Sequence, residues 1–343
     1  MSFPGPRRMN IFLTSLLFAP SIGGIETVSM ILAREFTAAG HEVRIATSTP
    51  DPASHTYGFD LVRRPTLGQL TARARWCDVY FQSNISLPLA APLLYVRRPW
   101  VVVHHTWIPL PIGFGGINHR AKRFLLRYAT SISISRAVAE SMPTPSVVIP
   151  NPYDASLFQV RDDIARTDDL VAFGRLVSDK GFDFLVEALA LLAKEGLRPR
   201  LTFIGEGPER GPLERQAREL GVAGQITFRG ALTGPQLVEE VNRHRIAVVP
   251  SRWKEPFGLV ALEAIACGCV VVGSREGGLA DAIGPCGVTF PNGDVPALAR
   301  ELANILKNPE LLIEYRERAQ DHLRRHHPAV VAGEYLKVFA SVR

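Results

Sequence analysis

Short apolar runs rich in β-branched residues alternate with helix-like segments along this chain, and that alternation limits the folds open to it. The clearest pair is the run 246–250, which predicts a buried strand, followed by the helical composition of residues 259–266. Similar pairs are expected from residue 9 to residue 150, and again from residue 170 onwards. Such alternation predicts an α/β chain built on parallel sheets.

The length and composition favour a globular protein of two domains. The chain has 343 residues, of which 46% are apolar and 21% charged, so each of two domains can bury its own core. No apolar stretch approaches the ~20 residues of a membrane span, and the N-terminal run is not typical of a signal peptide. The four cysteines lack metal-ligand spacing, which predicts a reduced, cytoplasmic protein.

The charge is concentrated in the first part of the chain. Residues 1–150 hold 15 Lys and Arg against 7 Asp and Glu, a balance of +8, while the remainder holds 24 against 26. A basic half indicates anionic partners: a phosphate-bearing acceptor, a lipid surface or nucleic acid. Nucleic acid is disfavoured because no recognised binding motif appears. The basic segment 118–128 allows contact with an anionic membrane, but an ordinary surface helix with an apolar stripe is favoured.

Two carboxylates flank the start of the helix expected after the strand 246–250. Glu255 lies in the loop, and Glu263 lies a little over one turn into the helix. The first helical N–H groups, near Gly258 and Leu259, lack partners within the helix and can bind an anion or a sugar hydroxyl. The carboxyl ends of strands are where open α/β sheets bind ligands. Either glutamate alone is more simply explained as a solvated charge.

Two cations accompany the first strand of the second half. Arg175 follows the expected strand 170–173, and Lys180 precedes the expected helix 182–194. Such a pair beside free helix N–H groups suits a pyrophosphate. The spacing is not that of a P-loop. The glycines at 205, 207 and 211 approach a dinucleotide-binding fingerprint, but the last comes one residue late and a proline interrupts them.

Three further features are weaker evidence for a ligand site when each is taken alone. Gly23 and Gly24, between a strand and a helix, can bring backbone N–H groups to a phosphate, although such a pair is usually only a turn. A buried strand at 100–103 delivers His104 and His105 at its carboxyl end. The histidines at 322, 326 and 327 lie among arginines, which predicts a solvated segment and not a metal cluster.

The segment from Glu255 through Pro256, Phe257, Gly258 and Leu259 to Glu263, with Gly277-Gly278-Leu279 downstream, resembles the donor-binding loop of retaining glycosyltransferases of family 4. The resemblance implies the GT-B fold, with two Rossmann-like parallel-sheet domains facing an interdomain cleft. It implies that Glu255 contacts the hydroxyls of the donor sugar and that Glu263 holds the ribose diol. A carboxylate suits a diol because its two oxygens accept two hydrogen bonds.

The resemblance extends over nearly the whole chain. It implies that Arg175 and Lys180 bind the donor diphosphate, that Gly23 and Gly24 lie beside it, and that one histidine reaches the donor sugar. Spacing from Pro99 favours His105 over His104. The acceptor domain is expected at 1–150, joined by a terminal helix at about 325–343, and the donor domain at 151–324. In the linker, Pro152 stands where the family usually has glycine, which stiffens the hinge.

The function expected from this resemblance is a retaining transfer of a sugar from a nucleoside diphosphate donor to a hydroxyl of a glycan, lipid or small-molecule acceptor. The chain contains no Asp-x-Asp, so no metal or other cofactor is expected, and the cations and helix N–H groups would neutralise the leaving diphosphate. Three alternatives stay open: a nucleotide-sugar epimerase of the same fold, a glycosidase with paired carboxylates, and a non-catalytic nucleotide-sugar-binding module.

Overall fold

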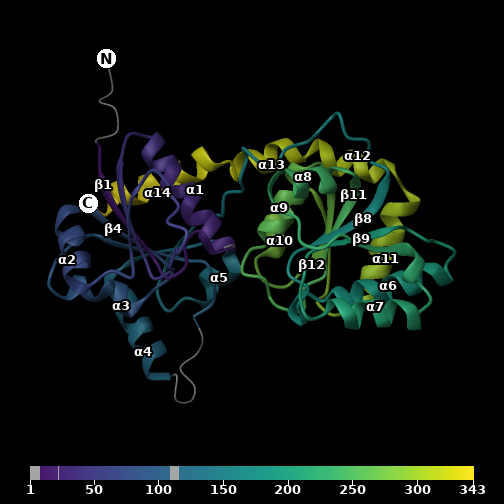
Figure 1. Ribbon diagram of the computed structural model, residues 1–343, viewed down its shortest axis with the longest axis horizontal. Coiled ribbons are helices and arrows are strands. Elements are labelled where there is room, and N and C mark those ends of the chain that lie inside the picture. Colours follow the sequence, from purple (N-terminus) through teal and green to yellow (C-terminus); the bar gives the residue numbers. More distant parts are fainter. Residues whose placement is uncertain (1–7, 22, 109–115) are drawn as a thin grey trace. The chain divides into compact units, whose positions relative to one another are not determined.

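The computed structural model describes residues 8–21, 23–108 and 116–343, and the chain divides into two compact units. Unit 1 contains residues 1–152 and 328–343, and unit 2 contains residues 153–327. Each unit has its own parallel sheet with helices around it (Figure 1). Within the described ranges, no helix is both long and apolar enough to cross a membrane.

The described part of unit 1 forms a seven-stranded sheet in the order β3-β2-β1-β4-β5-β6-β7. Its strands are β1 (Asn10–Ser15), β2 (Glu42–Thr47), β3 (Asp60–Arg63), β4 (Val79–Ser83), β5 (Trp100–His104), β6 (Thr130–Ser133) and β7 (Ser146–Val148). Its helices are α1 (Gly24–Ala38), α2 (Leu67–Trp76), α3 (Leu87–Ala90), η1 (Ala91–Leu94), α4 (Gly116–Leu125), η2 (Leu126–Tyr128), α5 (Arg136–Ser141) and α14 (Pro328–Ser341).

The terminal helix α14 belongs to the core of unit 1. It packs against α1 (Figure 1), and its aromatic face meets side chains from α1 and β4. The Phe339 ring lies 5.4 Å from that of Phe36 and 5.2 Å from that of Phe81, and Tyr335 lies 5.6 Å from Phe81. All four side chains are buried. Helical spacing places Tyr335 and Phe339 on one face, which explains why this helix docks.

Unit 2 forms a six-stranded sheet in its described residues, in the order β10-β9-β8-β11-β12-β13. Its strands are β8 (Asp168–Phe173), β9 (Leu201–Ile204), β10 (Ile226–Phe228), β11 (His244–Val249), β12 (Val270–Ser274) and β13 (Gly287–Phe290). Its helices are η3 (Ser178–Lys180), α6 (Phe182–Lys194), α7 (Arg210–Glu219), η4 (Ala223–Gln225), α8 (Gly234–Asn242), α9 (Leu259–Ala266), α10 (Leu279–Ile283), α11 (Val295–Lys307), α12 (Glu310–Glu317) and α13 (Ala319–Arg325).

The strand order of unit 2 is that of a doubly wound Rossmann-like sheet. Its first strand, β8, lies beside its fourth, β11, and the order runs outward in opposite directions from this pair. Helices α6, α7 and α11 cover one face through a shared apolar core, and α9 and α10 lie on the other side (Figure 1). The predicted α/β class with two parallel sheets is therefore confirmed.

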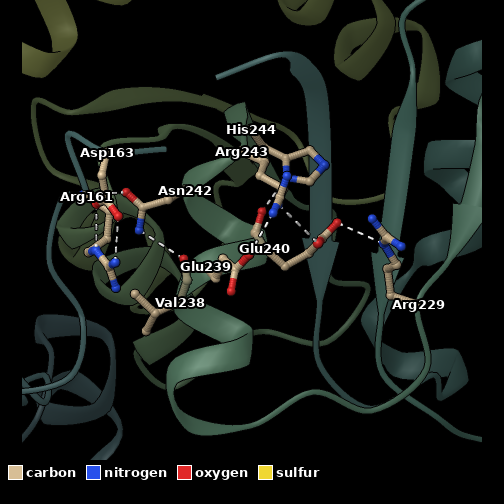
Figure 2. A network of polar contacts seen from close by, with 9 residues as sticks. All are labelled: Arg161, Asp163, Arg229, Val238, Glu239, Glu240, Asn242, Arg243 and His244. Carbon is tan, nitrogen blue, oxygen red and sulfur yellow. Dashed lines mark hydrogen bonds and ion pairs between the residues drawn. The ribbon is translucent and has the colours of Figure 1, made fainter. Parts of the chain in front are cut away.

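A network of polar contacts ties the loop after residue 154 to the amino end of β11 (Figure 2). The buried Asn242 side chain donates to the carbonyl oxygens of Gln159 and Val238 at 3.1 and 2.9 Å and accepts from the Arg161 backbone N–H at 2.9 Å. Nearby, Glu240 pairs with Arg229 at 3.0 Å. The contacts of Asn242 satisfy a buried polar group near the amino end of β11, whereas the candidate site follows the carboxyl ends of the strands.

Candidate functional site

The two loops singled out in unit 2 leave neighbouring strands. Arg175 follows β8, and the segment from Ser251 to Glu255 follows β11, at the point where the strand order reverses. In doubly wound sheets the crevice outside this point, at the carboxyl ends of the strands, is the usual ligand site. The topology therefore brings together residues that lie some eighty positions apart in the sequence.

Backbone contacts hold these two loops against each other. The backbone N–H groups of Arg252 and Trp253 donate to the carbonyl oxygen of Asp179, at 3.0 and 3.2 Å. Gly181, which precedes α6, has a φ of +64°, and a Cβ there would collide with the carbonyl oxygen of Pro250. Only glycine combines that backbone conformation with so close an approach. The start of α6 is thus held at the end of β11.

Lys180 and Glu255 form an ion pair across the two loops. The Lys180 ammonium lies 2.7 Å from Oε1 of Glu255, and the Ser251 hydroxyl donates to the same oxygen at 2.8 Å. The two charged side chains are only 27% and 12% exposed, so solvent screens the pair weakly. Within the described residues, Oε2 of Glu255 receives no hydrogen bond, which leaves that oxygen able to accept a ligand hydroxyl.

Ser251 is itself anchored by the next two strands. Its carbonyl oxygen accepts from the Ser274 hydroxyl at 2.8 Å and from the Asn292 amide at 3.2 Å. Asn292 in turn accepts from the Glu276 backbone N–H at 2.9 Å. Sequence reasoning missed Ser251, Ser274 and Asn292. Ser251 lies four residues before Glu255 in the sequence, but nothing in that spacing indicates that it orients the carboxylate.

Arg175 differs from Lys180 in having no side-chain partner among the described residues. Its side chain is exposed and forms no ion pair or hydrogen bond with any described residue. An unpaired guanidinium at the carboxyl end of β8 can accept a phosphate bidentately without first breaking another contact.

The helix α9 begins without a side-chain cap. Gly258 is its N-cap residue, with a φ of +101°, and Leu259 is its first residue. Gly277 and Gly278 support the loop before this helix. The Gly278 backbone N–H donates to the Glu255 carbonyl oxygen at 2.7 Å, and Gly277 pairs with Glu255 in an isolated parallel β-bridge. The N–H groups of the first turn therefore stay available to an anion.

Phe257 and two buried histidines support the start of α9. The His326 ring lies 5.7 Å from Phe257 and 4.8 Å from His322, whose Nε2 lies 2.8 Å from the Ala282 carbonyl oxygen. The prediction of a solvated histidine segment was wrong for His322 and His326, since both are buried. The neighbouring Arg324 and Arg325 are exposed, whereas His322 and His326 face the interior of unit 2.

Glu263 occupies the second turn of α9 as a partly buried side chain. Burial of its carboxyl raises the pKa to about 7, and the negative charge of Asp154 adds to this shift. The carboxyl forms no hydrogen bond with a described residue. A poorly solvated carboxyl without a partner gains free energy from hydroxyl donors, which fits a diol ligand.

In unit 1, both candidate histidines are buried at the end of β5. The Nε2 of His104 lies 3.1 Å from the Ser131 hydroxyl, and burial lowers the pKa of His104 to about 4. The backbone N–H of His105 donates to the Asn84 side chain at 2.7 Å. Burial, reinforced by His104, lowers the pKa of His105 to about 3, and the Asn151 side chain acts in the opposite direction. His105 is therefore a neutral imidazole near pH 7.

The glycine pair stands at the start of α1. Gly23 is the N-cap residue, in extended conformation and without a side-chain cap, and Gly24 is the first helical residue. Ile22, within the same loop, lies outside the described residues. The carboxylate of the buried Glu26 lies over Gly23, 2.6 Å from where a Cβ would stand. A diphosphate placed here would meet that negative charge, a feature that sequence reasoning did not consider.

No group of three or more His, Cys, Asp or Glu side chains in the described ranges is arranged to hold a metal ion.

About half of the chain is similar to a known protein family. Residues 162–322 match the family described as Glycosyl transferases group 1. Glycogen synthase of Mycobacterium tuberculosis (strain H37Rv) is 37% identical over 166 residues, which cover 47% of this chain and 40% of that protein. The GDP-mannose-dependent alpha-(1-6)-phosphatidylinositol monomannoside mannosyltransferase of Mycolicibacterium smegmatis is 26% identical over 337 residues, which cover 85% of this chain and 88% of that protein.

Solved structures share the fold over nearly the whole chain. Alr3699/HepE of Anabaena, in complex with UDP, has a TM-score of 0.82 and 20% identity, covering 97% of this chain and 100% of that one. Sucrose-phosphate synthase of Thermosynechococcus elongatus has a TM-score of 0.79 and 21% identity, covering 98% and 99%. Both parallel-sheet units thus have the Rossmann-like fold of GT-B proteins. The family match lies within unit 2 and spans the loops after β8 and β11.

Proposed function

We propose that this chain is a retaining glycosyltransferase of family 4 that moves a sugar from a nucleoside diphosphate donor to an acceptor hydroxyl. The observation that carries the proposal is the ion pair of Lys180 with Glu255 at the strand-order reversal of unit 2, with Arg175 in the loop after β8 and Glu263 in the helix after the Glu255 loop. One site would then hold cations that bind a diphosphate and carboxylates that bind the hydroxyls of the ribose and of the transferred sugar. The family match to this unit supports it.

In this proposal different residues of unit 2 bind the diphosphate, the ribose and the transferred sugar of the donor. Arg175 and the first N–H groups of α9, next to Phe257, Gly258 and Leu259, hold the diphosphate. Glu263 accepts the ribose hydroxyls, for which its poorly solvated carboxyl is suited. Glu255 accepts a hydroxyl of the transferred sugar at Oε2, while Lys180 and Ser251 occupy Oε1.

The leaving diphosphate gains negative charge as the glycosidic bond breaks. Arg175, Lys180 and the α9 N–H groups neutralise this charge without a metal ion. We place His105 of unit 1 on the donor sugar as a neutral hydrogen-bonding group, since its low pKa leaves it uncharged. Gly23 and Gly24 are proposed to lie beside the diphosphate, with the Glu26 carboxylate limiting how closely an anion approaches them.

The proposal is tested by incubating the full chain, in chelator, with a panel of nucleotide sugars and measuring nucleoside diphosphate release with and without acceptors. The panel includes UDP-glucose because a similar structure was solved in complex with UDP, and GDP-mannose because a similar protein is a GDP-mannose-dependent mannosyltransferase. We expect release to increase strongly with one class of acceptor. Donor consumption unaffected by acceptors would instead indicate an epimerase, and donor binding without turnover would indicate a binding module.

Retention is tested separately on the product. The anomeric proton of the new glycoside, followed by NMR from the first turnovers, is expected to keep the configuration of the donor. An inverted product would contradict membership of the retaining family while leaving the donor site unaffected.

A further inference from the structure

The most exposed of the large apolar side chains in the described part of the chain belong to two segments of unit 1. Among the described residues, the four most exposed large hydrophobic side chains are Ile117, Tyr95, Leu94 and Tyr128, at 80%, 74%, 72% and 70%. Phe124 is also 52% exposed. We call these five residues the α4 face. Single exposed apolar residues are ordinary, but a gathering of the most exposed ones indicates an interaction surface.

The two segments that carry the α4 face are packed on one core. Leu93, Leu125 and Leu126, which neighbour the exposed residues in sequence, belong to the same apolar cluster as α3. Figure 1 shows α4 next to α3 at one end of unit 1. The helix keeps Leu126 buried and turns Ile117, Phe124 and Tyr128 outward. Of the apolar residues in the segment 118–128, Leu125 and Leu126 pack on the core, as expected for a surface helix, whereas Phe124 faces solvent.

Helical spacing makes the exposed stripe continuous. Positions 117, 124 and 128 recur at intervals of seven and four residues, which places them on one side of the α4–η2 segment. The Phe124 and Tyr128 rings lie 5.9 Å apart, and the Arg127 guanidinium lies 5.5 Å from the Phe124 ring. The exposed apolar side chains of this segment are therefore neighbours on one surface, and a guanidinium lies next to one of their aromatic rings.

The charge around the α4 face has a single sign. Residues 79–139 contain seven Lys and Arg and no Asp or Glu. Arg97, Arg120 and Arg127 are exposed, and none of the three forms an ion pair with a described residue. A surface that combines large apolar side chains with unpaired cations is complementary to lipid headgroups of negative charge above acyl chains.

We propose that the α4 face docks unit 1 on an anionic bilayer surface, with the apolar side chains in the headgroup region and the arginines on the lipid phosphates. A nucleic acid would use the cations but would leave Ile117 and Leu94 without a role. Dependence on both the apolar and the basic side chains therefore distinguishes a membrane from a soluble polyanion.

The first test measures co-sedimentation of the full chain with vesicles, without donor or acceptor, so that its outcome is independent of the glycosyltransferase proposal. Vesicles of phosphatidylcholine and phosphatidylglycerol in equal parts are compared with pure phosphatidylcholine. We expect binding to the anionic vesicles, weaker binding to the neutral ones, and a steep loss with salt, since screening acts over about 8 Å at 0.15 M.

Paired variants then separate the two contributions. Removing two cations by Arg120→Gln with Arg127→Gln is expected to weaken binding about fivefold per cation. Removing the exposed rings by Phe124→Ser with Tyr128→Ser is expected to weaken it by about tenfold or more. The matched control is Ile313→Ser with Arg300→Gln, which changes an exposed apolar residue and an exposed arginine of unit 2 and is expected to bind like the wild type.

A site-specific label locates the contact. All four native cysteines are buried, so a cysteine introduced by Ile117→Cys reacts selectively with an environment-sensitive fluorophore. Its emission is expected to shift to the blue on anionic vesicles, whereas a label at Ile313→Cys, also well exposed, is expected not to shift. Equal binding to neutral and anionic vesicles, unchanged binding of both paired variants, or identical responses of the two labels would overturn the proposal.

Discussion

At the residue scale, the site depends on a carboxylate whose two oxygens have different surroundings. Ser251 and Lys180 both hydrogen-bond Oε1 of Glu255, and Oε2 stays available. An oriented carboxylate needs no reorganisation when a sugar hydroxyl arrives, which is the advantage of a preorganised site. Ser251 is therefore a positioning residue that acts through Glu255.

Ser251→Ala is expected to lower kcat/KM for the nucleotide sugar by about tenfold, because a hydrogen bond to a charged group contributes about 1.5–3 kcal/mol. Binding of the free nucleoside diphosphate, which lacks the sugar, should change little. Ser251→Thr keeps the hydroxyl and should recover most of the activity. Equal losses in nucleoside diphosphate binding and in kcat/KM would show that Ser251 only supports the loop.

Glu263 predicts a pH dependence of stability. Its pKa is raised from 4.5 to about 7, so between these values the folded protein holds a proton that the unfolded chain releases. Stability therefore falls as pH rises from about 4.5 to about 7, by about 3 kcal/mol in total. Glu263→Gln removes this contribution. Urea unfolding of both proteins at several pH values checks it, and the same slope in both would contradict the raised pKa.

The choice between the two histidines is also testable. His105→Ala is expected to lower kcat about a hundredfold, as for the loss of one transition-state hydrogen bond, with little change in affinity for free nucleoside diphosphate. His104→Ala removes a ring that contacts Ser131 and is expected to affect stability more than kcat. If His104→Ala alone produced the kinetic loss, the choice of His105 would be wrong.

Some of these residues could be identified from the sequence and others could not. Arg175 and Lys180 are candidates by their places at a strand end and a helix start, whereas Glu255 and Glu263 are candidates mainly because their segment resembles a donor-binding loop. The ion pair between Lys180 and Glu255 could not be foreseen from the residues, because it depends on β8 lying beside β11. The burial of His322 likewise depends on which side of α13 faces α9.

At the scale of elements, segments with strong local signals have the expected bounds. The helix predicted over residues 182–194 is α6 with the same bounds, because apolar spacing and flanking glycines define it. The orientation of α4 was not predictable: its sequence has an apolar stripe, and only packing decides whether that stripe is covered. Leu125 and Leu126, not Phe124, face the core.

The docking of α14 includes a polar defect. The hydroxyl of Tyr335 is buried and has no hydrogen-bond partner among the described residues. Tyr335→Phe keeps the aromatic contacts with Phe36 and Phe81 and removes the unsatisfied group, so the free energy of unfolding should rise by about 1 kcal/mol. Tyr128→Phe, at an exposed position, is the control and should have no effect. Urea unfolding measures both, and a loss of stability in Tyr335→Phe would indicate a partner for the hydroxyl.

At the scale of the whole molecule, both units are built on a parallel sheet, and in each unit the candidate site residues lie after the carboxyl ends of inner strands. In unit 1 the glycine pair follows β1 and the histidines end β5, while in unit 2 the charged loops follow β8 and β11. The alternation of strands and helices was enough to predict this class of fold. The order of strands within each sheet was not, because non-local pairing leaves no periodic signal in the sequence.

The central claim is that Arg175 and Lys180 stabilise a diphosphate as it leaves. It is tested most directly by the turnover of Arg175→Ala with Lys180→Ala, measured in chelator beside the affinity of each protein for the intact nucleotide sugar. Because charge on the diphosphate grows in the transition state, kcat/KM is expected to fall by more than the affinity. Arg175→Lys should recover only part of the activity, since a point charge lacks the two-pronged contact. Turnover of the double variant near that of the wild type would contradict the account.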